Sequence, residues 1–168
     1  MAKNKEIKTN AMRILEKHKI PYTTMTYECD EFVDALKIAD QLGLPYEQMY
    51  KTLVTVGSSK NYFVFVIPIH RELDLKKAAR SVGEKSVSMI HVKEINSVTG
   101  YIRGGCTAVG MKKQYVTRID ESARALDTMI VSGGKIGVQI RLKPEDLRLA
   151  CGGEFADLLM HEGGDGCE

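Results

Sequence analysis

The chain has 168 residues, 43% of them hydrophobic and 27% charged, which is typical of one compact globular domain. Its net charge of +2 argues against tight, nonspecific binding of nucleic acid through charge alone. The longest apolar run, from Tyr62 to Ile69, is too short to span a bilayer, and the first ten residues lack the apolar stretch of a secretory signal. We therefore expect a cytoplasmic protein that does not enter a membrane.

Helical and strand patterns alternate through the first part of the chain. They predict a helix over residues 9–21, a strand over 22–27, a helix over 30–43, and strands over 50–56 and 62–68. Pro21 ends the first helix, and Gly43 is typical of a helix C-terminus. The last two strands are expected to form a hairpin. The second of them is apolar on both faces, as expected of a central strand.

The second part of the chain continues this mixture. It predicts a helix over 73–83, a strand over 85–90, a short helix over 91–98, a strand over 114–119, a helix over 121–126, a hairpin over 128–142 and a helix over 144–153. Asp74 is a candidate N-cap, and Pro144 suits the first position of a helix. The glycine doublet Gly133-Gly134 predicts the turn of the hairpin.

These elements do not repeat as regular βαβ units, so the pattern favours an α+β fold with a mixed sheet. We expect a single domain over residues 1–160. The acidic segment 161–168 is expected to be a disordered tail.

Cysteine and histidine are too scattered for a metal site. There is no CxxC pair, and the histidines do not lie at the spacing of metal ligands. The residues are Cys29, Cys106, Cys151, Cys167, His18, His70, His91 and His161. We therefore expect no metal and no cofactor, and we expect the thiols to be free in a reducing compartment.

The glycine-rich stretch 99–110, with the sequence TGYIRGGCTAVG, is a candidate site. It is neither a dinucleotide fingerprint nor a P-loop. Its glycine doublet could direct backbone N–H groups at an anion or an oxyanion, although an ordinary turn is the simpler interpretation. Cys106 follows the doublet, and no histidine at a known spacing marks it as a nucleophile, so a structural role is favoured.

Lys51 begins an otherwise apolar strand. A lysine in this place could extend its ammonium group to water, or it could hold a phosphate or a carboxylate. The segment IVSGGK, residues 130–135, is likewise either a turn or the polar edge of a pocket. Basic pairs at Lys76-Lys77 and Lys112-Lys113 could attract a polyanion, although solvated surface charge explains each pair alone.

Together, several segments resemble the YbaK/EbsC family, the free-standing relatives of the editing domain of bacterial prolyl-tRNA synthetases. In chain order they are NAMRILEKHKIPY, TYECD, YKTLV, LDLKKAARSVG, VTGYIRGGCTAVG and IVSGGK. The resemblance extends from Thr9 to Leu158. It implies a mixed, barrel-like β-sheet flanked by helices.

The resemblance also implies an activity: deacylation in trans of mischarged tRNA, chiefly Cys-tRNA(Pro) and in some cases Cys-tRNA(Cys). The thiol of the substrate is expected to attack its own ester. Alternatives are hydrolysis of Ala-tRNA(Pro) by a water molecule, a non-catalytic module that binds tRNA or a synthetase, and a Schiff-base enzyme that uses Lys51. The implied partners are the acceptor end of misacylated tRNA and prolyl-tRNA synthetase.

By the same resemblance, the catalytic residues are Lys51 and Gly104. The implied substrate-binding residues are Tyr27, Thr52, Gly105, Ser132 and Gly133. Backbone N–H groups near Gly104 are expected to hold the ester carbonyl oxygen, and Lys51 to anchor the carbonyl or the terminal ribose-phosphate. The chain departs from the family pattern in three places: Ala108 replaces a usual proline, Gln139 a frequent acidic residue, and Cys106 an aliphatic one.

Overall fold

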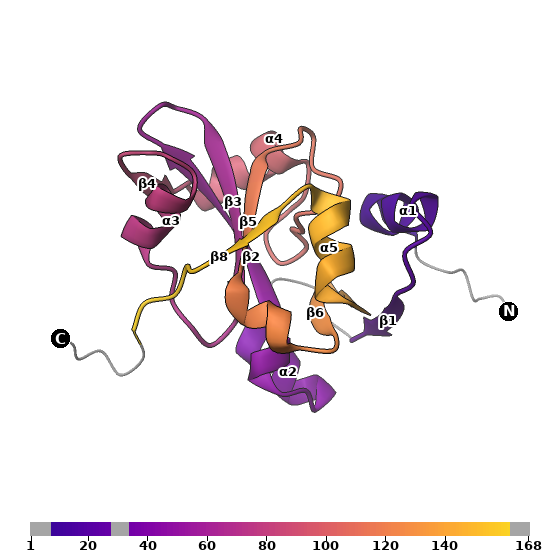
Figure 1. The fold of residues 1–168 in the computed structure, drawn as a ribbon. Coiled ribbons are helices and arrows are strands. Elements are labelled where there is room, and N and C mark those ends of the chain that lie inside the picture. The colour runs from indigo at the N-terminus through magenta and orange to yellow at the C-terminus, as the bar shows by residue number, and fades with distance from the viewer. Residues whose placement is uncertain (1–7, 28–33, 162–168) are drawn as a thin grey trace, which may run out of the picture.

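The computed structural model describes residues 8–27 and 34–161, which form two β-sheets with helices around them (Figure 1). The larger sheet has the strand order β4-β2-β3-β5-β8, and the smaller has the order β1-β7-β6. The strands are β1 (Thr23–Thr26), β2 (Tyr50–Gly57), β3 (Tyr62–Pro68), β4 (Val87–Met89), β5 (Val116–Asp120), β6 (Met129–Lys135), β7 (Val138–Leu142) and β8 (Glu154–Ala156). The predicted α+β class with a mixed sheet is confirmed.

Helices surround the sheets. The α-helices are α1 (Asn10–Lys17), α2 (Ala35–Leu42), α3 (Leu75–Ser81), α4 (Ile95–Thr99) and α5 (Pro144–Cys151), and the 3-10 helices are η1 (Tyr46–Gln48), η2 (Val92–Glu94) and η3 (Glu121–Ala125). The segment 121–126, predicted as a helix, is thus only a 3-10 helix, and the predicted helix 91–98 is η2 followed by α4. Within the described residues, none of these helices is long and apolar enough to cross a bilayer.

Local sequence signals explain where the helices begin. The carboxylate of Asp74 accepts hydrogen bonds from the N–H groups of Lys76 and Lys77, as predicted for an N-cap, and Pro144 is the first residue of α5. Asp34 caps α2, which therefore begins later than the predicted residue 30. Residues 30–33 of the predicted helix lie outside the described residues. The same is true of the predicted tail, except for His161.

The predicted hairpin of β2 and β3 is confirmed, with Lys51 opposite Ile67 in the antiparallel register. β3 is the middle strand of the larger sheet, and its residues from Phe63 onward are buried. β3 also pairs in parallel with β5, and β5 with β8. The sequence pattern predicts a central strand that is covered on both faces, and β3 has this position.

The hairpin of β6 and β7 turns in a different place from the one predicted. Its turn lies at Ile136-Gly137, and the doublet Gly133-Gly134 forms a bulge, because Ser132 pairs with Gln139 and Lys135 pairs with Val138. Gly134 has a φ of +102°, which a residue with a side chain rarely adopts. The doublet thus bends a strand that continues beyond it.

The two sheets pack against each other without closing into a barrel in the described part of the chain. Met49, just before β2, bridges to Ile130 of β6. Tyr50 and Val64 of the larger sheet share one hydrophobic core with Val131 of the smaller sheet, and apolar residues of α1 and α5 complete it. This arrangement brings the beginning of β2 close to β6, where the candidate site lies.

Candidate active site

A cavity of about 530 Å³ lies where β2 faces β6 and β7. Of the predicted site residues, Lys51, Thr52, Gly104 and Ser132 all line it. α2 and the segment from β4 to α4 supply other parts of its wall. Residues that are far apart in the sequence therefore share one cavity of the size that small ligands occupy.

Lys51 enters this space from a rigid position. Its backbone is held in the β2–β3 ladder, and the preceding Tyr50 is buried, with its hydroxyl 2.7 Å from the Ser122 hydroxyl. Lys51 itself is half-buried and lines the cavity. Among the described residues, its ammonium group has no carboxylate partner within 4.0 Å. It is thus a positive charge available to a bound ligand.

Gly104 lies in a tight turn. The N–H of Gly105 donates to the carbonyl of Ile102 at 2.9 Å, and Gly104 between them has a φ of +87°, as in a type II turn. The Gly105 N–H is therefore already occupied. The N–H groups of Gly104 and Cys106 have no partner within the described residues, and both residues line the cavity. They are the donors that this loop can offer to a bound oxygen.

Tyr27, Gly105 and Gly133 are not among the described residues that line the cavity. Tyr27 is close to it, because its hydroxyl lies 3.5 Å from the Nε2 atom of Gln139, which does line the cavity. Gly133 is a packing residue: its carbonyl accepts a 2.6 Å hydrogen bond from the Thr9 hydroxyl. Gly133 thus takes part in a contact within the protein, and its role in substrate binding stays a prediction.

Gly105 packs against the β6–β7 turn. A Cβ atom at this position would lie 2.9 Å from Cα of Lys135 and 3.0 Å from the backbone nitrogen of Ile136. Two further hydrogen bonds position the same loop. The Tyr101 hydroxyl donates to the carbonyl of Val109 at 2.6 Å, and the Asn10 amide donates to that of Gly110 at 2.9 Å. The turn with Gly104 is therefore held from several sides.

The Gly105→Ala variant is expected to be less stable than the wild type. Because its methyl group would meet backbone atoms, which cannot rotate away, the loop and the β6–β7 turn must separate, at a cost of about 1–3 kcal/mol in the free energy of unfolding. Urea unfolding followed by circular dichroism measures this loss, and Gly105→Val should lose more. An alanine variant as stable as the wild type would show that the contact is not a tight one.

Cys106 lines the cavity beside Gly104 but lacks the surroundings of a nucleophile. Burial raises the pKa of its thiol to about 11, so the thiol is protonated at neutral pH. Its Sγ atom lies 3.9 Å from the Thr99 hydroxyl, and no histidine is among the described residues that line the cavity. This agrees with the structural role predicted for Cys106.

The Cys106→Ala variant should therefore keep its activity. For the deacylation that the family resemblance implies, we expect a rate within about threefold of the wild type, because the change removes packing atoms and no nucleophile. Steady-state rates on Cys-tRNA(Pro), the substrate that the resemblance implies, test this directly. A rate that falls to background in a folded variant would contradict the structural role.

Gln139 and Arg103 also line the cavity, although sequence reasoning did not include them in the site. Gln139 is a polar residue with only 4% of its surface exposed. Its position opposite Ser132 in the β6–β7 ladder could have indicated it, had the turn been placed correctly. Arg103 directly precedes Gly104 in the sequence, and this position next to a predicted catalytic residue could have indicated that it belongs to the site.

Comparisons with known proteins indicate the family of this chain. Residues 30–149 match the family model of the aminoacyl-tRNA editing domain. A curated relative from Enterococcus faecalis, named as a proposed Cys-tRNA(Pro)/Cys-tRNA(Cys) deacylase, EbsC, is 46% identical over 164 residues, which are 96% of this chain and all of the relative.

Solved structures share the fold. A crystal structure described as a proposed trans-editing enzyme for prolyl-tRNA synthetase is 25% identical, with a TM-score of 0.79, over 93% of this chain and 100% of that one. A hypothetical protein, APE2540, has the same fold, with a TM-score of 0.81 at 20% identity over 90% of this chain and 99% of that one. From the family match and the relative that aligns over its whole length, this chain belongs to the aminoacyl-tRNA editing domain family.

Proposed function

We propose that this protein is a trans-editing deacylase that removes cysteine from mischarged Cys-tRNA(Pro). The main support is a single observation: Lys51 and the turn at Gly104 line one cavity in a chain 46% identical to a relative named for this activity. The relative's name also includes Cys-tRNA(Cys), which is therefore the second substrate to test. The proposal includes a single deacylase domain over residues 1–160 and a cytoplasmic location.

An aminoacyl ester is already activated, so the enzyme needs mainly to position it. In the proposed reaction, the N–H groups of Gly104 and Cys106 donate to the ester carbonyl oxygen as negative charge develops on it. One such donor contributes roughly 3 kcal/mol to transition-state binding. Lys51 lies on the same cavity and stabilises the same charge or the terminal ribose-phosphate.

The nucleophile in this proposal is the thiol of the substrate. After the thiol loses its proton to solvent, its sulfur attacks the carbonyl carbon and forms a thiolactone ring. The ester C–O bond breaks, and the ribose oxygen leaves with a proton as the hydroxyl of free tRNA. Water then opens the thiolactone to give cysteine. The protein supplies orientation, which is worth about 7–11 kcal/mol in favourable intramolecular reactions.

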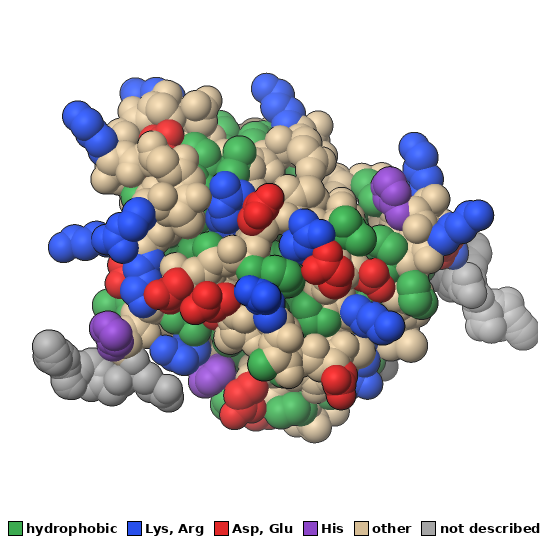
Figure 2. Space-filling view, in the orientation of Figure 1, with side chains coloured by type: hydrophobic (Ala, Val, Ile, Leu, Met, Phe, Trp, Pro, Cys, Tyr) green, Lys and Arg blue, Asp and Glu red, His purple; other side chains and the backbone are tan. Residues whose placement is uncertain are grey.

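The distribution of charge on the protein surface suggests that electrostatic attraction contributes little to the affinity for tRNA. On the face shown in Figure 2, Lys and Arg side chains alternate with Asp and Glu instead of forming one continuous basic patch. The net charge is only +2. We therefore propose that free tRNA binds weakly and that prolyl-tRNA synthetase delivers the mischarged molecule.

A deacylation panel tests the proposed function. Wild-type protein is incubated with Cys-tRNA(Pro), Cys-tRNA(Cys), Ala-tRNA(Pro) and Pro-tRNA(Pro), and the remaining ester is measured against time. The expected result is rapid loss of the cysteinyl ester and slow loss of the alanyl and prolyl esters. Faster turnover of Ala-tRNA(Pro) would indicate water-mediated hydrolysis instead, and no turnover of any substrate would indicate a binding module.

A further inference from the structure

Three exposed apolar side chains belong to segments that line the cavity. In the described part of the chain, the large apolar residues that are exposed are Leu75, Met89, Val92, Ile102, Val116, Leu149 and Met160. Met89 and Val92 also line the cavity, although 47% and 54% of their surfaces are exposed. Side chains that line a cavity and still face solvent lie at its opening. Ile102, 54% exposed, begins the turn whose next residues, Arg103 and Gly104, line the same cavity.

We call these segments the rim: β4, η2 and the turn from Ile102 to Gly105. Positive charge accompanies the apolar side chains there, because Lys93 follows Val92 and Arg103 follows Ile102, and both basic residues are exposed. η2 also contains one half-buried acidic residue, Glu94.

The acidic residues of the cavity lining lie outside the rim. They are Asp34, just before α2, and Glu72, after β3, and the other charged lining residue outside the rim is Lys51 of β2. A polyanion whose end lies in the cavity and whose chain extends out of it is therefore attracted to the basic residues of the rim and repelled by the two acidic residues. Apolar surface next to cations also suits unpaired nucleotides, whose bases have apolar faces and whose phosphates are charged.

We infer that the rim binds the single-stranded 3′ end of the tRNA, with bases against Met89, Val92 and Ile102 and phosphates near Lys93 and Arg103. This inference rests on the proposed function. If the aminoacyl group occupies the cavity, its covalent bond to the terminal ribose places that ribose at the opening. The preceding unpaired nucleotides must then cross a surface beside it, and the rim provides both kinds of contact.

A binding experiment tests the rim without any catalysis. Methionine methyl groups of the wild-type protein are labelled with ¹³C, and a short RNA hairpin that ends in CCA is added. The Met89 signal should shift in proportion to saturation. Met160 is the matched control, since it is similarly exposed, 49% against 47%, and does not line the cavity. A shift of Met160 alone, or no shift of Met89 at saturating RNA, would overturn the inference.

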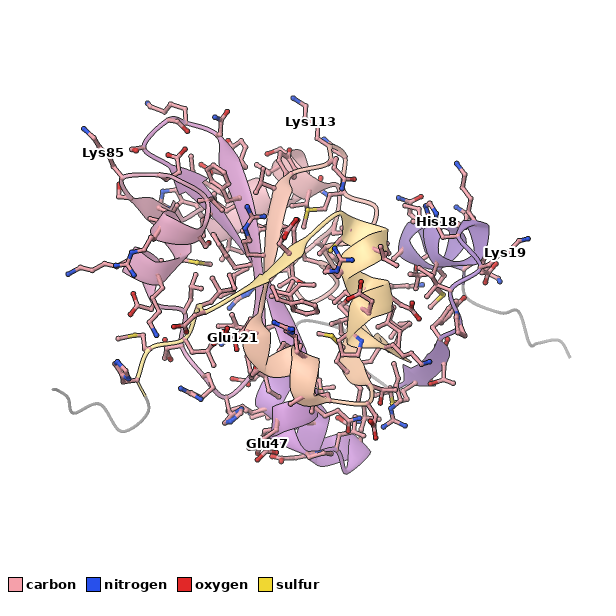
Figure 3. All side chains as sticks on the ribbon, viewed as in Figure 1. His18, Lys19, Glu47, Lys85, Lys113 and Glu121 are labelled. Atoms are coloured by element: carbon pink, nitrogen blue, oxygen red, sulfur yellow. The ribbon has the colours of Figure 1, made fainter. Side chains whose placement is uncertain are left out.

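Kinetics supply a second test. Two rim variants are compared with the wild type: the double variant Met89→Ser/Val92→Ser and the variant Lys93→Glu. Each should raise KM for Cys-tRNA(Pro) by about fivefold or more, which is the lower end of the loss in affinity expected when one base contact is removed. The rate of Lys93→Glu on cysteine ethyl ester, which has no nucleotide, should stay within about twofold of the wild type, because Lys93 does not line the cavity. Leu149→Ser and Lys113→Glu are the controls, because both residues are exposed and lie outside the cavity lining (Lys113 points into solvent in Figure 3).

The two tests separate this inference from the proposed function. A Met89 shift in a protein that deacylates nothing would support the rim and reject the deacylase. Normal deacylation with an unchanged KM in the rim variants would reject the rim and leave the deacylase in place. A Met89 signal that responds to prolyl-tRNA synthetase and not to RNA would assign the rim to a protein partner, which also overturns the inference.

Discussion

The Lys51→Ala variant is expected to lose about 100-fold in kcat/KM on Cys-tRNA(Pro), the effect of removing one group that stabilises transition-state charge. The reason is geometric. Lys51 is held in the β2–β3 ladder, it lines the cavity with Gly104, and its ammonium group has no carboxylate partner within 4.0 Å among the described residues. Single-turnover rates with saturating enzyme measure the loss in the chemical step.

The same variant should fold normally. A half-buried lysine without an ion pair contributes little to stability, so the free energy of unfolding should change by no more than about 0.5 kcal/mol. Lys51→Arg, which keeps the charge, should recover part of the activity if charge is what matters. Lys113→Ala is the matched control outside the cavity lining and should behave as the wild type. A folded and fully active Lys51→Ala variant would remove this lysine from the proposed mechanism.

Removal of the substrate's sulfur is expected to have an even larger effect. Alanine in place of cysteine on the same tRNA should slow deacylation by at least about 1,000-fold, because an intramolecular nucleophile is replaced by water. Binding should weaken much less, since one sulfur atom is a small part of the contact. Filter binding and single-turnover rates on the two esters separate these quantities.

The product and the pH profile identify the attacking thiol. Ring closure must release a cysteine thiolactone before free cysteine, whereas attack by Cys106 would leave an acyl group on the protein that mass spectrometry detects. The rate should rise with pH and level off near the pKa of an ordinary thiol, about 8.5. A rate that continues to rise towards the Cys106 pKa of about 11, or a covalent adduct on Cys106, would overturn the assignment.

Much of the local structure could be predicted from the sequence, because its causes are local. Alternating β-branched and apolar residues indicated the β2–β3 hairpin, and the apolar run of β3 indicated its central place. Asp74 and Pro144 marked helix starts correctly, since caps depend on the first turn of a helix alone. The order of the motifs along the chain was also sufficient to indicate the family.

The doublet Gly133-Gly134 shows where local reasoning failed. Glycines permit a turn and a bulge equally well, and the choice depends on which residues of the partner strand pair with Ser132 and Lys135. The sequence marked Gln139 only as a departure from the family pattern, because its position in the cavity follows from the register of β7. Register depends on long-range pairing that a single segment does not specify.

The sequence by itself indicated most of the helices and strands, the starts of two helices and the residue types available for chemistry. Only the tertiary structure decided which of them meet. Lys51, Gly104 and Ser132 come from three distant segments, and packing of the two sheets places them around one cavity. The same packing turned Gly105 and Gly133 into contact points of the scaffold, because their backbones lie too close to neighbouring atoms for a side chain.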